Sequence, residues 1–298
     1  MTAGPGARGV GWFRRILGPG AHGVGWFRRI LVSVLLLGLL GYGSVAGYLF
    51  FAQSRMVFHP KPGLDTTPEA WGMRYENVFF DSQGQRLHGW WIPGDPEKPV
   101  ILFFHGNASV LSGLKAHAEL FRRQGLGLFL FDYRGYGQSE GEPSEDGLYA
   151  DSLAAYAHLS GPLKIAPARI VYFGHSLGGG AATWLALRHS PRALILEGTF
   201  LSIPAVGEDR YPYLPIRLLS RIRFDNLERI RALCLPLLII HSQDDEVIAP
   251  HHGRALFEAA ACAPRKSYLE TRGRHNVSFN QGGALAEEGL RRFLASVP

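Results

Sequence analysis

The chain has 298 residues, 46% of them hydrophobic, which is enough for one large domain with its own core and an accessory segment. The formal net charge is +6, but residues 1–61 hold seven basic residues and no acidic one, so the other residues carry −1. The positive excess therefore belongs to the N-terminal tail. Without a basic stripe interleaved with aromatic residues, we expect no nucleic-acid partner.

Only two cysteines occur, Cys234 and Cys262, which excludes a disulfide-rich scaffold and a cysteine-ligated zinc site. The sequence favours small, buried hydrophobic residues at both positions. A second interpretation stays open. Cys234 precedes a predicted strand and Cys262 ends the helix after it, so a helix running back antiparallel would bring the two together as a disulfide, provided that the compartment is oxidising.

The N-terminus contains a direct repeat, in which residues 4–17 recur as residues 18–31 with His22 in place of Arg8. One duplication does not make a solenoid. Because the repeat is rich in glycine and proline, we predict a disordered basic N-terminus over residues 1–29.

Residues 30–52 contain no charged side chain and are long enough to cross a bilayer, which predicts a transmembrane anchor. Arg28 and Arg29 directly precede this segment, so the positive-inside rule places the N-terminus in the cytoplasm and the bulk of the chain on the extracytoplasmic side. The sequence around Ala46 resembles a signal-peptide cleavage site. The apolar run continues to Phe51, however, which favours an uncleaved signal anchor.

Residues 53–75 hold several prolines and are predicted to be a linker into one domain over residues 76–298. Short apolar runs bounded by turn residues predict eight strands, of which the first two form a hairpin. The predicted strands are 77–80, 86–92, 100–104, 126–131, 170–173, 193–196, 237–240 and 267–269. Helices are predicted at about 111–124, 145–159, 177–189, 251–261 and 285–294. This alternation predicts an α/β fold with a mixed, mostly parallel, eight-stranded sheet and helices on both faces.

Residues 199–232, here named the cap segment, interrupt the alternation of strands and helices. The segment is apolar with interspersed arginines, and connections of this length are usually functional. We expect it to form a small cap over a site. The alternative is two ordinary surface helices.

The run from Gly174 to Gly178 reads G-x-S-x-G between a predicted strand and a predicted helix. In this context the motif predicts a nucleophile elbow, with Ser176 on a strained turn that presents its hydroxyl. A side chain at either glycine would collide with the neighbouring strand or helix.

A serine nucleophile needs a base to take its proton and an acid to orient that base, in the chain order Ser, acid, His. Asp244 and Asp245 follow the strand that ends near residue 240, and His275 follows the last strand. The carboxyl ends of parallel strands share one edge of a sheet. We therefore predict His275 as general base and Asp245 as its orienting acid, with Asp244 as the alternative.

The oxyanion of an acyl-transfer reaction needs two backbone N–H donors. Leu177, directly after the nucleophile, supplies the first candidate, and Asn107, in the loop after the third strand, supplies the second. We expect His105 in the same loop to be structural, with its ring bonded to loop backbone.

These motifs, together with Phe103–Ala108 and Phe131–Gly141, resemble those of the α/β-hydrolase superfamily from about residue 75 to the C-terminus. The chain is similar to membrane-anchored α/β-hydrolase-domain proteins, monoacylglycerol lipases and serine aminopeptidases. The resemblance implies that the acid is Asp245, although Ser242 stands where the family usually has glycine and the Ile248–Pro250 run departs slightly from its pattern. It also implies a structural role for Asp132.

We therefore predict a serine hydrolase that cleaves carboxylic esters or thioesters, with acyl or lipid-type substrates favoured by the apolar cap segment and the anchor. It requires no metal and no cofactor. A peptidase or amidase is the alternative, in which Glu208 and Asp209 would bind the amino terminus of the substrate. A further alternative is a non-catalytic, membrane-tethered binding protein. The oligomeric state is not predicted.

Overall fold

The computed structural model describes residues 21–276 and 283–297. The chain separates into two compact units, and the boundary lies between Leu49 and Phe50. The second unit contains the whole sheet and the last turns of the N-terminal helix.

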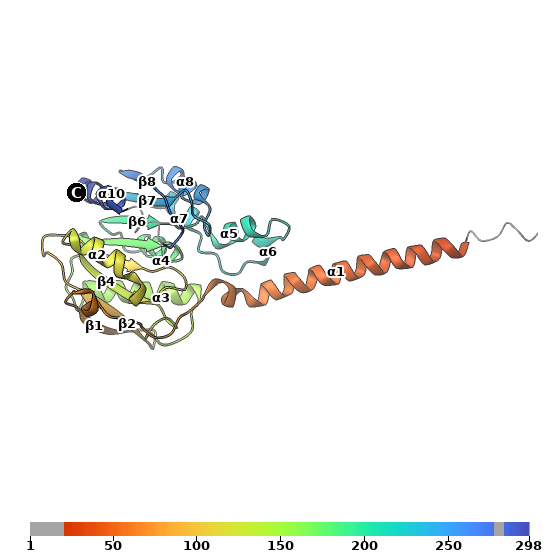
Figure 1. Cartoon of the computed structure of the whole chain (residues 1–298), viewed down its shortest axis with the longest axis horizontal. Coiled ribbons are helices and arrows are strands. Elements are labelled where there is room, and N and C mark those ends of the chain that lie inside the picture. The colour runs from red at the N-terminus through yellow and green to blue at the C-terminus, as the bar shows by residue number, and fades with distance from the viewer. Residues whose placement is uncertain (1–20, 277–282, 298) are drawn as a thin grey trace, which may run out of the picture. The chain divides into compact units, whose positions relative to one another are not determined.

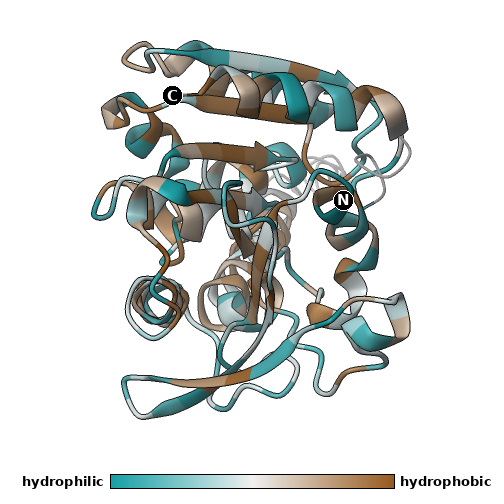
Figure 2. Ribbon diagram, turned by 90° about the vertical axis from the view of Figure 1, so that its left-hand side faces the viewer, coloured by the Kyte–Doolittle hydropathy of each residue, from teal (hydrophilic) through white to brown (hydrophobic). Residues whose placement is uncertain are grey.

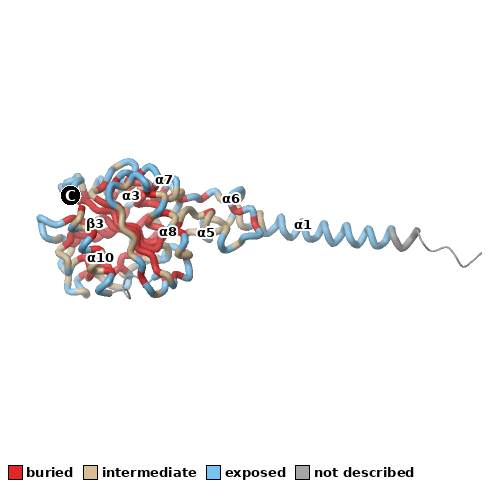
Figure 3. The backbone as a smooth tube through the Cα atoms, turned by 90° about the horizontal axis from the view of Figure 1, so that it is seen from above, coloured by how far each residue is buried: buried red, intermediate tan, exposed pale blue. Residues whose placement is uncertain are grey.

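Helix α1 spans Ala21–Val57. Large apolar side chains are exposed along it, and Figure 3 shows it as an exposed tube. It is the one helix among the described residues that is long and apolar enough to cross a membrane. The helix includes residues 21–29 of the segment predicted to be disordered, and it ends inside the predicted linker. The first copy of the repeat lies outside the described residues.

Eight strands form one sheet in the order β1-β2-β4-β3-β5-β6-β7-β8 (Figure 1). β1 and β2 pair antiparallel, as do β2 and β4, and β3 to β8 are parallel throughout. The strands span Glu76–Ser82, Gln85–Ile92, Val100–Phe104, Gly127–Asp132, Ile170–His175, Ala193–Glu197, Leu237–Ser242 and Lys266–Thr271. The predicted fold class, including the strand number and the antiparallel hairpin, is confirmed.

The helices of the domain lie in the connections from β3 onward and after β8. They are α2 (Lys115–Arg123), α3 (Glu145–Ser160), α4 (Gly178–Ala186), α5 (Ile203–Arg210), α6 (Ile216–Leu219), α7 (Asn226–Ala232), α8 (Pro250–Ala259) and α10 (Gly283–Ser296). Short 3₁₀ turns lie at Pro68–Trp71, Leu111–Leu114 and Pro167–Arg169. Ser144 caps α3 by accepting a hydrogen bond from the Gly147 N–H. The negative charges of Glu145 and Asp146 in the first turn interact favourably with the positive end of the helix dipole.

The sheet is buried on both faces because its central strands are apolar at every position. In β3, Leu102 and Phe104 belong to the core cluster on one face of the sheet, which includes residues of α3, α4, α7 and α8, whereas Ile101 and Phe103 belong to the cluster on the other face, with residues of α2 and α10. This is the pattern expected of a parallel strand with a core on each side. The central strands are mainly apolar in Figure 2 and buried in Figure 3. The carboxyl edge of this rigid sheet carries the loops of the predicted site.

The cap segment lies between β6 and β7 and contains α5, α6 and α7. Its two ends are tied together, since the Ile203 N–H donates to the Arg223 carbonyl oxygen at 2.8 Å and the Leu227 N–H donates to that of Leu201 at 3.0 Å. α5 and α6 therefore form an excursion that leaves and re-enters the domain at one place. Ile216 packs so closely on α5 that a Cβ at Gly207 would lie 2.7 Å from its side chain.

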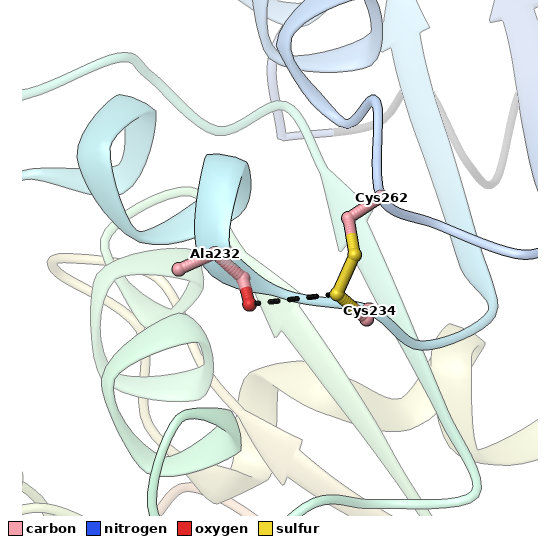
Figure 4. The surroundings of a disulfide bond; sticks show 3 residues. All are labelled: Ala232, Cys234 and Cys262. Carbon is pink, nitrogen blue, oxygen red and sulfur yellow. Dashed lines mark hydrogen bonds between the residues drawn. A yellow bond between two sulfur atoms is a disulfide. The ribbon is translucent and has the colours of Figure 1, made fainter.

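Cys234 and Cys262 form a disulfide with Cα atoms 4.7 Å apart (Figure 4). Both residues are exposed, so the favoured interpretation of two buried thiols is wrong. Cys234 Sγ also lies 4.0 Å from the Ala232 carbonyl oxygen, which is a contact rather than a hydrogen bond because a bonded sulfur has no proton to donate. The bridge links the entry to β7 with the segment that follows α8.

Replacing both cysteines with serine is expected to lower the free energy of unfolding by about 3–4 kcal/mol, because the bridge closes a loop with a sequence separation of 28 residues. The measurement is the thermal unfolding midpoint of the full chain in detergent. Wild-type protein treated with reductant serves as control and should unfold with the double variant. Equal midpoints for oxidised wild type and the double variant would contradict the expectation.

Candidate active site

Ser176 lies directly after β5, in the turn that leads into α4, and its φ is +51°, in the left-handed region that costs a non-glycine residue energy. The flanking glycines make the turn sterically possible. A Cβ at Gly178 would lie 2.0 Å from the Phe104 carbonyl oxygen, and one at Gly174 would lie 2.7 Å from the Gly179 Cα. A side chain at either position would therefore collide with the neighbouring strand or helix, as predicted. Ser176 N–H donates to the Glu197 carbonyl oxygen at 2.9 Å, which holds the turn against β6.

The structure brings the predicted serine, histidine and aspartate together. His275 Nε2 lies 2.9 Å from Ser176 Oγ, and His275 Nδ1 lies 2.7 Å from Asp245 Oδ2. All three side chains are buried. They meet although their positions in the sequence are far apart. Ser176 follows β5, Asp245 follows β7 and His275 follows β8, so the carboxyl edge of the sheet assembles the group.

Asp245 and Asp244 have different environments, which distinguishes the two predicted acids. Asp245 Oδ1 accepts the N–H groups of Val247 and Ile248 at 2.9 and 2.8 Å, leaving Oδ2 for His275. Burial pushes the pKa of Asp245 upward, but the bonds to His275 and to the two amides outweigh burial, so the pKa lies below its ordinary value. Asp244 is exposed and pairs with Arg272 at 3.0 Å. Only Asp245 faces the histidine.

The loop after β3 lies against the elbow. A Cβ at Gly106 would lie 2.8 Å from the His175 ring and 3.2 Å from Ser176 Cβ, so glycine permits the close approach. Within the described residues, the N–H groups of Leu177 and Asn107 donate to no protein acceptor. Such unpaired donors beside a nucleophile suit an oxyanion.

The side chain of Asn107 has a role that the sequence did not indicate. Its Oδ1 accepts the Tyr136 hydroxyl at 2.9 Å and the His59 N–H at 2.8 Å, and its Nδ2 donates to the Val57 carbonyl oxygen at 2.7 Å. The loop is thus fixed by the last residue of α1 and by the residues after it. The sequence shows an asparagine after His-Gly, but it does not indicate the hydrogen bonds of this side chain, because the partner residues are far away in the chain.

His105 and Asp132 have the structural roles expected of them. His105 Nδ1 donates to the Gly106 carbonyl oxygen at 2.8 Å, and Asp132 Oδ1 accepts the Leu111 N–H at 3.1 Å. Both side chains are fully buried. Burial lowers the pKa of His105 to about 4 and raises that of Asp132 to about 8, so both groups are neutral near pH 7.

Asp132→Asn is expected to change how stability depends on pH. The unfolded carboxyl ionises near pH 4 while the folded one keeps its proton to about pH 8, so wild-type stability falls across this window and the isosteric amide removes that fall. Thermal midpoints of both proteins from pH 5 to pH 8 test this, with 1 kcal/mol corresponding to roughly 2–4 °C. A midpoint difference that stays constant across the window would contradict it.

A buried cluster behind the nucleophile was missed by the sequence analysis. The Glu197 carboxylate at the end of β6 lies 2.9 Å from His117 Nε2 and 3.2 Å from His175 Nδ1. Burial raises the pKa of Glu197, but the two imidazoles outweigh burial and hold it well below the ordinary value. An acid at the end of an otherwise apolar strand was the available signal.

Asp209, His251 and His252 form the group among the described residues whose donor atoms lie close enough to hold a metal ion. His252 Nδ1 accepts the Leu201 N–H at 3.2 Å, so in the neutral ring the proton is on Nε2, which donates to Asp209 Oδ2 at 3.0 Å. A metal-ligating imidazole normally donates its other N–H instead. The contacts are therefore those of a hydrogen-bonded link between α5 and α8, rather than those of a metal centre.

Comparison with known proteins agrees with this architecture. Residues 95–226 match the family described as serine aminopeptidase, S33. An uncharacterized protein of Mycobacterium tuberculosis is 35% identical over 84% of this chain and 90% of its own length. The α/β hydrolase domain-containing protein WAV2 of Arabidopsis thaliana is 34% identical over 85% and 92%. An uncharacterized membrane protein of Saccharomyces cerevisiae is 33% identical over 73% and 79%.

Solved structures resemble the fold at lower sequence identity. An esterase of Pyrococcus furiosus, Pf2001, superposes with a TM-score of 0.67 at 20% identity and covers 80% of this chain and 99% of its own. Est1E of Butyrivibrio proteoclasticus, solved with ferulic acid, superposes with a TM-score of 0.58 at 20% identity and covers 72% and 98%. At this identity the two likenesses concern the fold.

Proposed function

This chain belongs to the α/β-hydrolase superfamily, and on that premise we propose that it is a serine hydrolase that cleaves carboxylic esters or thioesters. One observation carries the proposal, namely the continuous chain of contacts from Ser176 Oγ through the His275 ring to the Asp245 carboxylate. In this chain the serine is the nucleophile, the histidine is the general base and the aspartate orients the histidine.

In the proposed reaction, Ser176 Oγ attacks the carbonyl carbon of the substrate while His275 Nε2 takes the hydroxyl proton. His275 Nδ1–H donates to Asp245 throughout, which fixes the ring and stabilises the imidazolium. His275 then gives the proton to the departing alkoxide or thiolate, and an acyl-enzyme remains. A water molecule, deprotonated by His275, attacks the acyl carbon, and the carboxylic acid leaves as Ser176 regains its proton.

The oxyanion of each tetrahedral intermediate is proposed to accept the N–H groups of Leu177 and Asn107. The support is the position of Leu177 at the start of α4, the approach of the Asn107 loop to Ser176 and the unpaired state of both N–H groups within the described residues. Removing one such donor typically costs about 10²- to 10³-fold in kcat. The chemistry requires no metal and no cofactor.

We propose that residues 30–52 anchor the protein in a membrane as a single span, with the domain on the extracytoplasmic side. The exposed apolar surface of α1 and the Saccharomyces cerevisiae relative described as a membrane protein support the anchor. Arg28 and Arg29 before the span support the orientation. The Cys234–Cys262 disulfide supports it independently, since disulfides persist in oxidising compartments. An anchored enzyme of this kind suits apolar acyl esters.

A serine peptidase or amidase is the second candidate, favoured by the description of the matched family. In this version Glu208 and Asp209 would bind the amino terminus of a substrate. Both are already engaged, because Glu208 pairs with Arg217 at 2.7 Å and Asp209 with His252 at 3.0 Å. These pairings favour the esterase or thioesterase.

The test is hydrolysis of p-nitrophenyl esters of increasing acyl length, with matched p-nitroanilide amides, by the detergent-solubilised full chain. We expect ester hydrolysis to exceed amide hydrolysis and to disappear in Ser176→Ala. Ser202→Ala, which removes only the cap of α5, is the matched control and should keep its activity. Amide cleavage faster than ester cleavage would favour the peptidase, and equal rates for wild type and Ser176→Ala would refute both.

A further inference from the structure

The last turns of α1, residues 50–57, belong to the same compact unit as the sheet and make specific contacts with the cap segment. Gln53 Nε2 donates to the Leu219 carbonyl oxygen at 2.6 Å, and Gln53 Oε1 accepts the Arg221 N–H at 2.7 Å. The Gln53 side chain therefore bonds a backbone carbonyl group at the last residue of α6 and a backbone N–H group just after it. These bonds hold α6 beside the end of α1.

The contacts reach the apolar run itself. The Arg221 guanidinium lies over the Phe50 ring, 4.8 Å from its centroid, and Phe50 is within the apolar run over residues 30–52. An arginine on an aromatic ring at the end of a membrane-spanning segment is typical of the interface, where the charge reaches the headgroups and the ring stays among the chains. If the run spans a bilayer, the point where it leaves the bilayer is next to α6.

α6 presents a surface suited to that position. Leu218 is 85% exposed, the highest value for a large apolar side chain among the described residues, whereas its neighbour Ile216 is buried against α5. Arg217 and Arg221, both exposed, lie on either side of Leu218 in the sequence. An exposed leucine between arginines combines insertion into the acyl boundary with attraction to lipid phosphates.

We propose that the part of the cap segment around α6 is a second membrane contact, in which Leu218 inserts into the headgroup–acyl boundary of the bilayer and Arg221 binds lipid phosphates. Arg217 keeps its ion pair with Glu208 and adds positive charge beside the leucine. The partner is the bilayer that holds α1, because the bonds of Gln53 leave α6 within hydrogen-bond reach of the helix turn where the apolar run ends. This inference rests on the proposed anchor and not on the proposed chemistry. Val57, at the end of the same helix, also bonds Asn107, so the contact would bring the predicted oxyanion loop near the membrane surface.

The test places a nitroxide spin label on the full chain in vesicles of phosphatidylcholine and phosphatidylglycerol. Because Cys234 and Cys262 are bonded to each other, Leu218→Cys introduces a single free thiol. Leu285→Cys, on an exposed leucine of α10, is the matched control, and Leu36→Cys reports on the anchor. Power saturation compares relaxation of each label by oxygen, which concentrates in the bilayer, with relaxation by a water-soluble nickel chelate.

We expect oxygen to relax the labels at 218 and 36 more than the chelate does, and the reverse order at 285. A label at 218 that behaves like the one at 285, with the label at 36 in the bilayer, would overturn the membrane contact alone. Labels in water at both 36 and 218 would overturn the anchor and the contact together. None of these results depends on hydrolytic activity, so a failure of the proposed hydrolase would be recognised separately from the ester assay.

Discussion

Asp245→Asn is expected to lower kcat for ester hydrolysis by about 10⁴-fold while leaving the protein folded. The reason lies in the two oxygens of this carboxylate. Oδ1 accepts the N–H groups of Val247 and Ile248, so an asparagine keeps its oxygen there and turns its NH₂ toward His275. That NH₂ donates to Nδ1 and forces the ring proton onto Nε2, which then has no lone pair to take the proton of Ser176.

The matched control is Asp244→Asn, one residue earlier in the chain. Asp244 is exposed and binds Arg272 and the Gly273 N–H, away from the histidine. We expect its kcat to stay within about twofold of wild type, as for a surface substitution. Steady-state kinetics on one ester, with thermal midpoints to confirm folding, compares the two variants. A comparable loss in both, or a loss confined to Asp244→Asn, would show that the acid is assigned to the wrong residue.

Glu197→Gln is expected to cost about 3–5 kcal/mol of the free energy of unfolding, because it removes the charge that His117 and His175 surround in the interior. The thermal midpoint should fall by roughly 10 °C. Since the folded pKa of Glu197 lies below its ordinary value, the stabilisation is present above about pH 4 and decreases as the pH falls further. The Glu197 carboxylate also lies 3.2 Å from His175, the residue directly before Ser176, so ester hydrolysis should decrease as well.

Glu270→Gln provides the comparison on the surface. Glu270 forms an exposed ion pair with Arg254 at 3.0 Å, and such pairs contribute at most about 1 kcal/mol. Thermal unfolding of both variants in the same detergent gives the difference. If Glu197→Gln unfolded at the temperature of Glu270→Gln, the buried cluster would not have the stabilising role assigned to it.

The parts of the fold that could be predicted are those that local sequence determines. Val100–Phe104 is apolar at every position because both faces of β3 are covered, and a run of this kind indicates a buried strand. The turn at Ser176 was recognisable because glycine is required where a Cβ would meet backbone. The order of Ser176, Asp245 and His275 along the chain, each after a strand, allowed their meeting to be predicted from the topology of a parallel sheet.

The parts that could not be predicted depend on distances between segments that are remote in the sequence. The sequence favoured buried thiols at Cys234 and Cys262 and left the disulfide only as an alternative, because the 4.7 Å between their Cα atoms depends on how remote segments pack. Gln53 stands in a segment predicted to be a linker, and its hydrogen bonds depend on the position of the cap segment. The glycine-rich composition suggested disorder up to residue 29, whereas residues 21–29 are part of α1.

The most direct test of the central claim is the reaction of the full chain with a fluorophosphonate, followed by mass spectrometry of the peptides. The account predicts one covalent adduct, on Ser176, that is absent from Ser176→Ala and strongly reduced in His275→Ala, because the hydroxyl is nucleophilic only with its base in place. An adduct on another serine would contradict the assignment of Ser176 as the nucleophile, and folded protein without any adduct would contradict the assignment of this chain as a serine hydrolase.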